Sequence, residues 1–197
     1  MAPNKILICG DSFSYDHGLA QSWVSRLNQL YSITNLSQCG CSEYKVKLQL
    51  ARVELSYFDV IMMFHTSPNR LYINQTYAMT NTPSHEHCDL LFSDVESKKS
   101  QSSLARIAYD YFVHIFDRDY YQYVHDLILS DLDQITKPFR VLHFTHFDYT
   151  QMYDFRGTLI SFYDIFLQHK GNINHLDQQG NDMIFLQVTE QLDKILK

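Results

Sequence analysis

The 197-residue sequence predicts an α/β protein, a three-layer α/β/α sandwich built on a mostly parallel sheet. Over the first third of the chain, short continuous apolar runs alternate with segments whose apolar residues recur at helical spacing. This β-α-β-α-β order is typical of a parallel sheet with helices on both faces. The length and the 45% hydrophobic content fit one domain, residues 1–197, with a long helical or irregular insertion at about 71–137.

The strands are predicted from their apolar residues. The first, from Lys5 to Gly10, is a continuous apolar run that stops at a glycine, as buried parallel strands often do. Residues 32–37 and 59–65 form the second and third strands, and the third is apolar almost throughout. A fourth strand follows at residues 140–146, where apolar and polar side chains alternate.

Helices are predicted where apolar residues recur with the period of an α-helix. These segments are residues 18–31, 42–55, 99–137, 157–170 and 178–196. The longest of them breaks near residues 117–119 and is therefore expected to form two helices. Residues 66–96 are aromatic and polar without a regular pattern, so we expect an irregular segment there.

The charge and hydropathy of the chain argue against two classes of partner. The net charge is -6 and no run of lysine and arginine is present, whereas phosphate binding favours a basic face. No apolar run is long enough for a membrane span or a secretory signal. We therefore expect a soluble cytoplasmic protein that binds neither nucleic acid nor membrane. A virion-associated protein would have the same features, and the oligomeric state stays open.

No cofactor is predicted, and the one candidate metal motif is weak. His85, His87 and Cys88 carry ligand side chains in the run His-Glu-His-Cys, but the sequence offers no fourth ligand nearby. A polar loop is the more frequent origin of such a run, so no metal is expected. Cys39 and Cys41 are too close for an easy disulfide, and the four cysteines together fit a reducing compartment.

Candidate catalytic groups lie where the predicted strands end, because ligands bind at the carboxyl ends of strands in open parallel sheets. The first strand is followed by Gly10, Asp11 and Ser12, which places a hydroxyl nucleophile and its backbone N–H at that edge. Gly40 follows the second strand and lets a backbone N–H approach a ligand closely. Each of these segments is, on its own, also compatible with a plain turn and a helix cap.

Two further segments add polar groups. Ser67, Asn69 and Arg70 follow the third strand and bring hydroxyl, amide and guanidinium groups to the same edge. A polar loop turned by a proline is the alternative interpretation. His175 precedes the last predicted helix, and a serine with a histidine is the smallest pair that activates a hydroxyl at neutral pH. We assign Asp11, Asn69 and Arg70 to substrate binding.

Taken together, these segments resemble the SGNH (GDSL) hydrolase family. The resemblance covers both ends of the chain, at residues 10–14, 35–42, 59–70 and 172–181, and leaves about 71–137 uncovered. The pattern is similar to a subgroup found in phage and environmental bacterial proteins, in which the third block reads Thr-Ser-Pro-x-Arg. The resemblance implies a flavodoxin-like α/β/α fold.

The resemblance also implies roles for single residues. It makes Ser12 the nucleophile, His175 the base, and the N–H groups of Ser12 and Gly40 oxyanion donors. A third donor, an asparagine in the family, falls on Ser67 here. Either the Ser67 hydroxyl donates instead, or Asn69 takes over, or that donor is missing. Loss of one such donor costs roughly 10²–10³-fold in rate.

A second departure concerns the acid of the triad. The family usually has Asp three residues before the histidine, whereas this chain has Asn172. An amide oxygen can orient the imidazole but does not offset its positive charge, and the equivalent change in a serine protease costs about 10⁴-fold in kcat. Three outcomes follow: a working Ser–His pair oriented by Asn172, an acid supplied by Asp148, Asp154 or Asp177, or lost catalysis.

The expected function is that of a serine-dependent esterase that removes a small acyl group, such as acetyl, from a carbohydrate or similar ester. The small acyl group is implied by the resemblance. Two alternatives stay open. One is a non-catalytic binding or structural protein with the same fold, such as a virion component. The other is an O-acyltransferase that uses a sugar hydroxyl in place of water.

Overall fold

A five-stranded, all-parallel sheet forms the centre of the computed structural model. The structure describes residues 3–74, 88–147, 153–156, 159–173 and 175–197. The strand order is β2-β1-β3-β4-β5. The strands are β1 (Lys5–Cys9), β2 (Ser32–Asn35), β3 (Val60–His65), β4 (Val141–Thr145) and β5 (Leu159–Ser161). Because all five run in the same direction, their carboxyl ends lie at one edge of the sheet.

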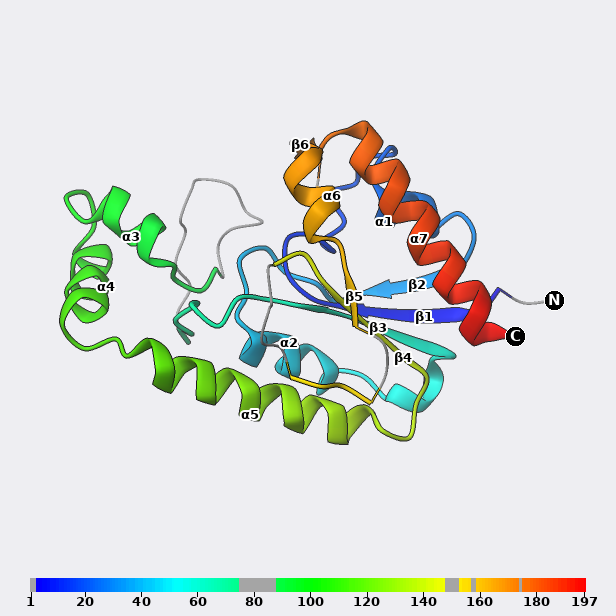
Figure 1. The fold of residues 1–197 in the computed structure, drawn as a ribbon, viewed down its shortest axis with the longest axis horizontal. Helices are drawn as coiled ribbons and strands as arrows, with labels where there is room; N and C mark the ends of the chain where they lie inside the picture. Colours follow the sequence, from blue (N-terminus) through cyan, green and yellow to red (C-terminus); the bar gives the residue numbers. More distant parts are fainter. Residues whose placement is uncertain (1–2, 75–87, 148–152, 157–158, 174) are drawn as a thin grey trace.

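The core has two halves, one on each face of the sheet. On one face, Ile6 and Ile8 of β1 pack with buried residues of α1 (Trp23–Leu27), α6 (Tyr163–Gln168) and α7 (Gln178–Leu196). On the other face, Leu7 and Cys9 pack with α2 (Glu43–Leu50) and α5 (Arg118–Thr136). Figure 1 shows the same arrangement, with helices above and below the sheet. This alternation along β1 gives three layers, as the sequence predicts.

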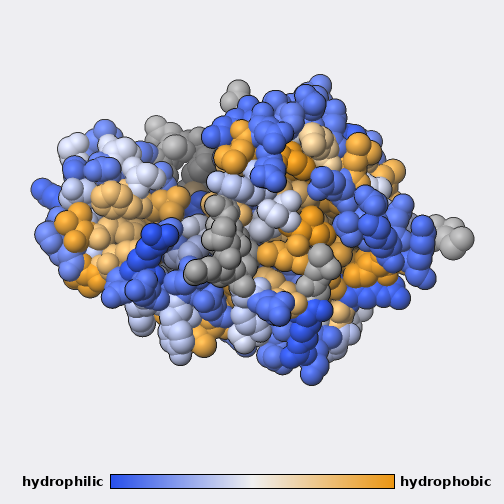
Figure 2. All heavy atoms as spheres, in the orientation of Figure 1, coloured by the Kyte–Doolittle hydropathy of each residue, from blue (hydrophilic) through white to orange (hydrophobic). Residues whose placement is uncertain are grey.

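Helices α3 (Phe92–Lys98) and α4 (Ser103–His114) pack against each other at one end of the molecule, away from the two covering layers (Figure 1). Their small core includes Val95 and Ala108. Figure 2 shows apolar side chains at the surface of this end. Ile107 of α4 and Ile115, which follows it, are among the exposed apolar residues.

The predicted elements agree with the structure in most places. The first four strands are confirmed, the final helix has the predicted bounds, and α4 and α5 are separated close to the predicted break. The predicted helix at 18–31 is wrong in length, because only α1 is helical and both Leu19 and Leu30 are exposed. The predicted helix at 42–55 ends at Leu50 and is followed by the 3-10 turn η1 (Leu55–Tyr57).

Two further predictions need correction. The segment 157–170, predicted as one helix, contains β5 and the shorter helix α6, and its last residue begins the short strand β6 (Lys170–Ile173). The segment 66–96, predicted as irregular, contains the first residues of α3. In the part of the chain that the structure describes, no helix is both long enough and apolar enough to cross a membrane.

Candidate active site

Ser12 and His175 lie side by side, although 163 positions separate them in the sequence. Ser12 follows β1 at the carboxyl edge of the sheet, and His175 lies in the turn before α7. The Oγ of Ser12 is 3.0 Å from Nε2 of His175, which is hydrogen-bond distance. The structure therefore brings together the two side chains that the sequence analysis paired.

A tight turn after β1 holds Ser12 in place. The backbone N–H of Ser14 donates to the carbonyl of Asp11 at 3.2 Å, and the N–H of Phe13 donates to Oδ1 of Asp11 at 3.0 Å. Gly10 starts this turn in a space too small for any side chain, since an added Cβ would lie 2.4 Å from Oγ of Ser14. Glycine at the strand end is therefore required by packing.

His175 is held in an unusual backbone conformation. Its φ of 64° lies in the left-handed region, which costs a residue other than glycine about 1–2 kcal/mol. Hydrogen bonds on both sides fix the turn: the N–H of Gly171 donates to the His175 carbonyl, and the N–H of Asp177 donates to the carbonyl of His169. The ring of Phe13 lies 5.0 Å from the imidazole between centroids. Strain of this kind is common where a side chain must point in a defined direction.

The pair opens into a pocket of about 350 Å³. Gly40 and Arg70 also line this pocket, together with residues of α3. Gly40 has a φ of +61°, and an added Cβ there would lie 2.7 Å from the sulfur of Cys88. A side chain at this position would thus be strained and would also clash. The predicted oxyanion residues Ser12 and Gly40 consequently share one pocket.

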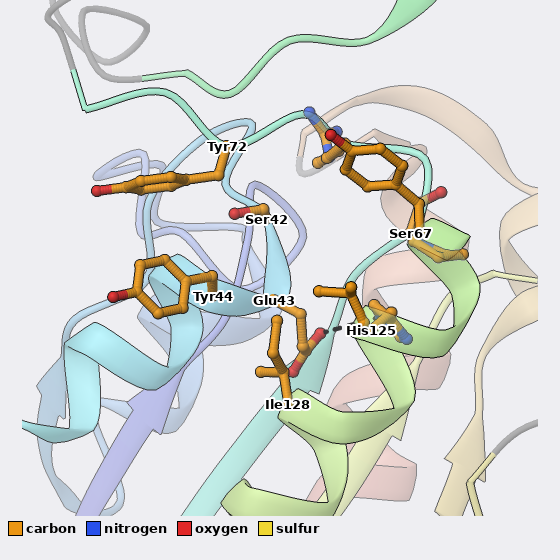
Figure 3. Close-up of a pocket in the computed structure, with 11 residues that line it drawn as sticks. Ser42, Glu43, Tyr44, Ser67, Tyr72, His125 and Ile128 are labelled. Atoms are coloured by element: carbon orange, nitrogen blue, oxygen red, sulfur yellow. Dashed lines mark ion pairs between the residues drawn. The ribbon is translucent and has the colours of Figure 1, made fainter. Parts of the chain in front are cut away.

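Two other predicted residues lie elsewhere. Ser67 lines a separate pocket of about 240 Å³ with Glu43, Tyr72 and His125, and Figure 3 shows it on the wall beside α5. Its Oγ accepts the backbone N–H of Asn69 at 3.2 Å. Asn69 is exposed and lines a third cavity. The described lining of the Ser12 pocket includes neither of them, so the expected third oxyanion donor from Ser67 or Asn69 is not found there.

The reason lies in how the chain leaves β3. The N–H of Thr66 donates to Oε2 of Glu43 at 2.9 Å, and the carbonyl of Thr66 lies 2.9 Å from Nε2 of His125. These two hydrogen bonds hold the start of the loop against α2 and α5. Of the three loop residues that we assigned to the site, only Arg70 lines the Ser12 pocket in the described structure.

Asp11 lies beneath the site and not in it. Its side chain is fully buried, so the predicted contact with substrate is not supported; Asp11 instead holds the turn through the Phe13 N–H. Burial raises the pKa of Asp11 to about 6, although the positive charge of Arg70 works in the opposite direction. His146 stacks on Phe13, and burial, with smaller contributions from Arg70 and His175, holds its pKa well below the ordinary value.

The candidate acids for His175 differ in what the structure says of them. The side chain of Asn172 and all of Asp148 lie outside the described residues. Asp154 is exposed. Asp177 caps α7, because one of its oxygens accepts the N–H of Gly180 at 2.7 Å and the other lies 3.4 Å from Nδ1 of His169. The Asp177 carboxylate thus has a structural role already.

A buried network of charged groups was missed by the sequence analysis. Oε1 of Glu43 lies 2.8 Å from Nδ1 of His65, and Nε2 of His65 lies 2.9 Å from Nδ1 of His143. Burial raises the pKa of Glu43, but His65 and His125 outweigh it and hold the value at about 2. The pKa of His143 is lowered to about 3, mainly by burial and further by His65.

The pattern of the sequence hid this network. Glu43 reads as an ordinary acidic residue in the first turn of a helix, a position that suits exposed carboxylates. The one available signal was His65 at the end of an otherwise apolar strand, because a polar residue in a buried strand requires a partner. Which partner it finds depends on the packing of α2 and α5 against the sheet.

Among the described residues, no group of three or more His, Cys, Asp or Glu side chains is placed to hold a metal ion. His85 and His87 lie outside those residues, so the expectation that they bind no metal stays a prediction. The four cysteines are buried and form no disulfide with one another, and burial raises the pKa of Cys88.

Comparison with known proteins gave no relative: no family model, curated protein or solved structure matches this chain. The chemistry is therefore judged from the site itself. A serine hydroxyl lies within hydrogen-bond distance of an imidazole nitrogen at the carboxyl edge of a parallel sheet. The pair lies beside a pocket large enough for a small ligand. This arrangement can transfer the hydroxyl proton to the imidazole while the oxygen attacks an electrophilic carbon.

Proposed function

We propose that the chain is a serine-dependent ester hydrolase of the SGNH (GDSL) type. The observation that carries this proposal is the distance of 3.0 Å between Ser12 Oγ and His175 Nε2. The pair also lies at the carboxyl edge of the sheet, where ligands bind in folds of this class. The proposed substrate is a small acyl ester, such as an acetyl group on a carbohydrate, and the acyl group follows from the family resemblance.

The reaction has two steps, acylation of Ser12 and hydrolysis of the acyl-enzyme. His175 takes the proton of Ser12 while the Oγ forms a bond to the ester carbonyl carbon, giving a tetrahedral intermediate. The bond to the alcohol oxygen then breaks, and His175 returns the proton to the departing alcohol. Water attacks the acyl-enzyme in the same way, with His175 as the base. The products are a carboxylic acid and the free Ser12 hydroxyl.

The oxyanion formed in each step needs hydrogen-bond donors that are already in place. The backbone N–H of Ser12 and that of Gly40 are the proposed donors. In support of this role, Gly40 lines the same pocket as Ser12, and contact with Cys88 leaves no room for a side chain at position 40. The left-handed φ of Gly40 is also a conformation that glycine adopts without strain.

The first test compares wild type with Ser12→Ala and His175→Ala on p-nitrophenyl acetate. Both variants should lose about 10⁴-fold or more in kcat, because the nucleophile and base act as one unit. A fluorophosphonate should label wild type at Ser12, as seen by mass spectrometry of the labelled peptide. Ser56→Ala is the matched control: it changes an exposed serine that is distant from Ser12 in the sequence, and it should keep full activity.

Asn172 favours a second candidate, a non-catalytic binding module that keeps the fold. If wild type neither turns over p-nitrophenyl acetate nor reacts with the fluorophosphonate, the hydrolase proposal fails and this candidate replaces it. Retention of wild-type turnover in Ser12→Ala would equally rule out Ser12 as the nucleophile.

A further inference from the structure

Among the described residues, Arg70 alone lines both the Ser12 pocket and the pocket that Glu43 and Ser67 line. Its guanidinium lies against the backbone of Gly40: an ideal Cβ on Gly40 would be 3.5 Å from the terminal Nη1 of Arg70. That distance is ordinary van der Waals contact, so the guanidinium lies beside Gly40 and the proposed oxyanion donors. A permanent positive charge consequently stands at the wall of the pocket that contains the nucleophile.

Among the residues that the structure describes, Arg70 forms no ion pair with a carboxylate. The buried Nε–H of Arg70 has no hydrogen-bond partner among the described residues. The charge of Arg70 lowers the pKa of the buried Asp11, although the described contacts of the Asp11 carboxylate are with Phe13 and His146. Its Oδ1 accepts the N–H of Phe13, and its Oδ2 lies 3.5 Å from Nε2 of His146. Burial raises the pKa of Asp11 to about 6, and the charge of Arg70 works in the opposite direction.

A second cation lines the same pocket. Lys98 extends from the last turn of α3, and Asp94, one turn earlier, is the acidic residue in the described lining. The described walls thus carry Arg70 and Lys98 against a single carboxylate, whereas the chain as a whole has a net charge of -6. A locally positive pocket on an acidic protein concentrates anions at that one place.

From this geometry we propose that the Ser12 pocket selects esters whose alcohol part carries a negative charge, with Arg70 as the main contact and Lys98 as a weaker one. The proposal rests on the ester hydrolase function and names its substrate class. The planar fork of Arg70 suits a carboxylate or phosphate group. The pocket volume of about 350 Å³ leaves room for an alcohol part beyond a small acyl group.

Two esters of nearly equal size and reactivity test this selection. One is 4-acetoxybenzoate, which is anionic, and the other is its methyl ester, which is neutral. Wild type should have the higher kcat/KM for the anionic ester. Arg70→Gln should lower kcat/KM for that ester about 10- to 100-fold, mainly through KM, because a hydrogen bond between charged groups is lost. The neutral ester should change by less than about threefold, since it makes no charged contact with Arg70.

Variants at Lys98 and Lys99 provide a matched comparison on one helix. Lys98→Gln should weaken selection for the anionic ester by a few-fold, because a partly exposed charge contributes modestly. Lys99 lies outside the described lining of the pocket and faces Tyr109, so Lys99→Gln should leave both esters unchanged. In wild type, added salt should lower kcat/KM for the anionic ester and leave the neutral one nearly constant.

Three results would overturn the proposal. The first is that wild type shows no preference between the two esters, and the second is that its preference does not respond to salt. Alternatively, Arg70→Gln would lower kcat equally for both esters, which would show that Arg70 stabilises the oxyanion and does not select the substrate. Arg70→Lys keeps the positive charge and therefore distinguishes loss of the charge from misfolding. Thermal unfolding shows whether each variant is folded.

Failure of the hydrolase function can be told apart from failure of this proposal by a binding measurement. Ser12→Ala removes the nucleophile but leaves the pocket cations in place. Titration calorimetry should show that Ser12→Ala binds 4-hydroxybenzoate, and that the double variant with Arg70→Gln binds it at least tenfold more weakly. Equal binding by both proteins would overturn the anion site, whatever the outcome of the activity assays.

Discussion

At the scale of single residues, the chemistry of the molecule depends on how buried charges are paired. Glu43 is almost completely buried, and its carboxylate contacts the ring of His65 and the N–H of Thr66. His125 adds to this group, and although burial lowers the pKa of His125, its contacts with Glu43 raise it above the ordinary value. The carboxylate therefore fixes the end of β3, from which the loop to Arg70 begins.

Glu43→Gln should destabilise the protein by about 3–5 kcal/mol at pH 7, because it removes one partner of a buried charged network and leaves the others in place. The effect should depend on pH. The folded pKa of Glu43 is about 2, below its ordinary value of 4.5, so its contribution is complete above pH 4.5 and is lost as the pH falls towards 2. Urea unfolding of wild type and variant at several pH values measures this difference.

The matched control is Glu96→Gln on α3, where the side chain is exposed, and its effect should stay within about 0.5 kcal/mol. A difference between wild type and Glu43→Gln that stays constant from pH 7 to pH 2.5 would contradict the assigned ionisation. A difference below about 1 kcal/mol at pH 7 would show that the network contributes little to stability.

Single residues also mark the limit of the sequence analysis. Ser12 and His175 could be paired from sequence because each follows or precedes an element with a clear pattern, and because their neighbours fit a family resemblance. Ser67 and Asn69 were assigned to the same edge by the same reasoning, but contacts of Thr66 direct their loop elsewhere. Those contacts come from α2 and α5, and no local pattern around Thr66 encodes them.

At the scale of elements, long patterns were predictive and short ones were not. The first three strands followed from their apolar residues, the fourth from its alternation, and the nineteen-residue helix α7 from its helical periodicity. The strand β5 has three residues, pairs at the sheet edge and is only partly buried, so its pattern is too short to separate from that of the adjoining α6. Helix α1 is shorter than predicted because Leu19 and Leu30, which fit the helical spacing, face solvent.

The start of α7 gives a prediction at this scale. Asp177→Ala should cost about 1 kcal/mol of stability, because it removes the N-cap acceptor of Gly180 N–H. Asp177→Asn keeps an acceptor and should cost less. Because the carboxylate serves the cap, Asp177→Asn should retain most of the rate of fluorophosphonate labelling at Ser12. A loss of about 10⁴-fold in that rate would instead identify Asp177 as the acid that acts on His175.

At the scale of the whole molecule, the site joins the two ends of the chain. Ser12 belongs to the first strand, and His175 precedes the last helix, so neither local segment can form the pair alone. The link between them runs through the shared core of β1, β3 and α7, in which Ile6, Met62 and Ile184 are buried together. The reactivity of Ser12 should therefore report the integrity of the whole sheet and its helical cover.

This dependence predicts that the rate of fluorophosphonate labelling at Ser12 falls with urea at the same midpoint as the circular dichroism signal of the helices. The reason is that His175 lies in a turn that is hydrogen-bonded within itself and joined to the cap of α7, through Gly171 N–H to the His175 carbonyl and Asp177 N–H to the His169 carbonyl. We therefore expect His175 to leave Ser12 only when α7 leaves the sheet. Ile184→Ala should shift both midpoints together by the loss of about 2–5 kcal/mol. Leu186→Ala, on the exposed face of the same helix, should shift neither midpoint. Labelling that disappears well before the helical signal would show that the turn detaches from a folded sheet.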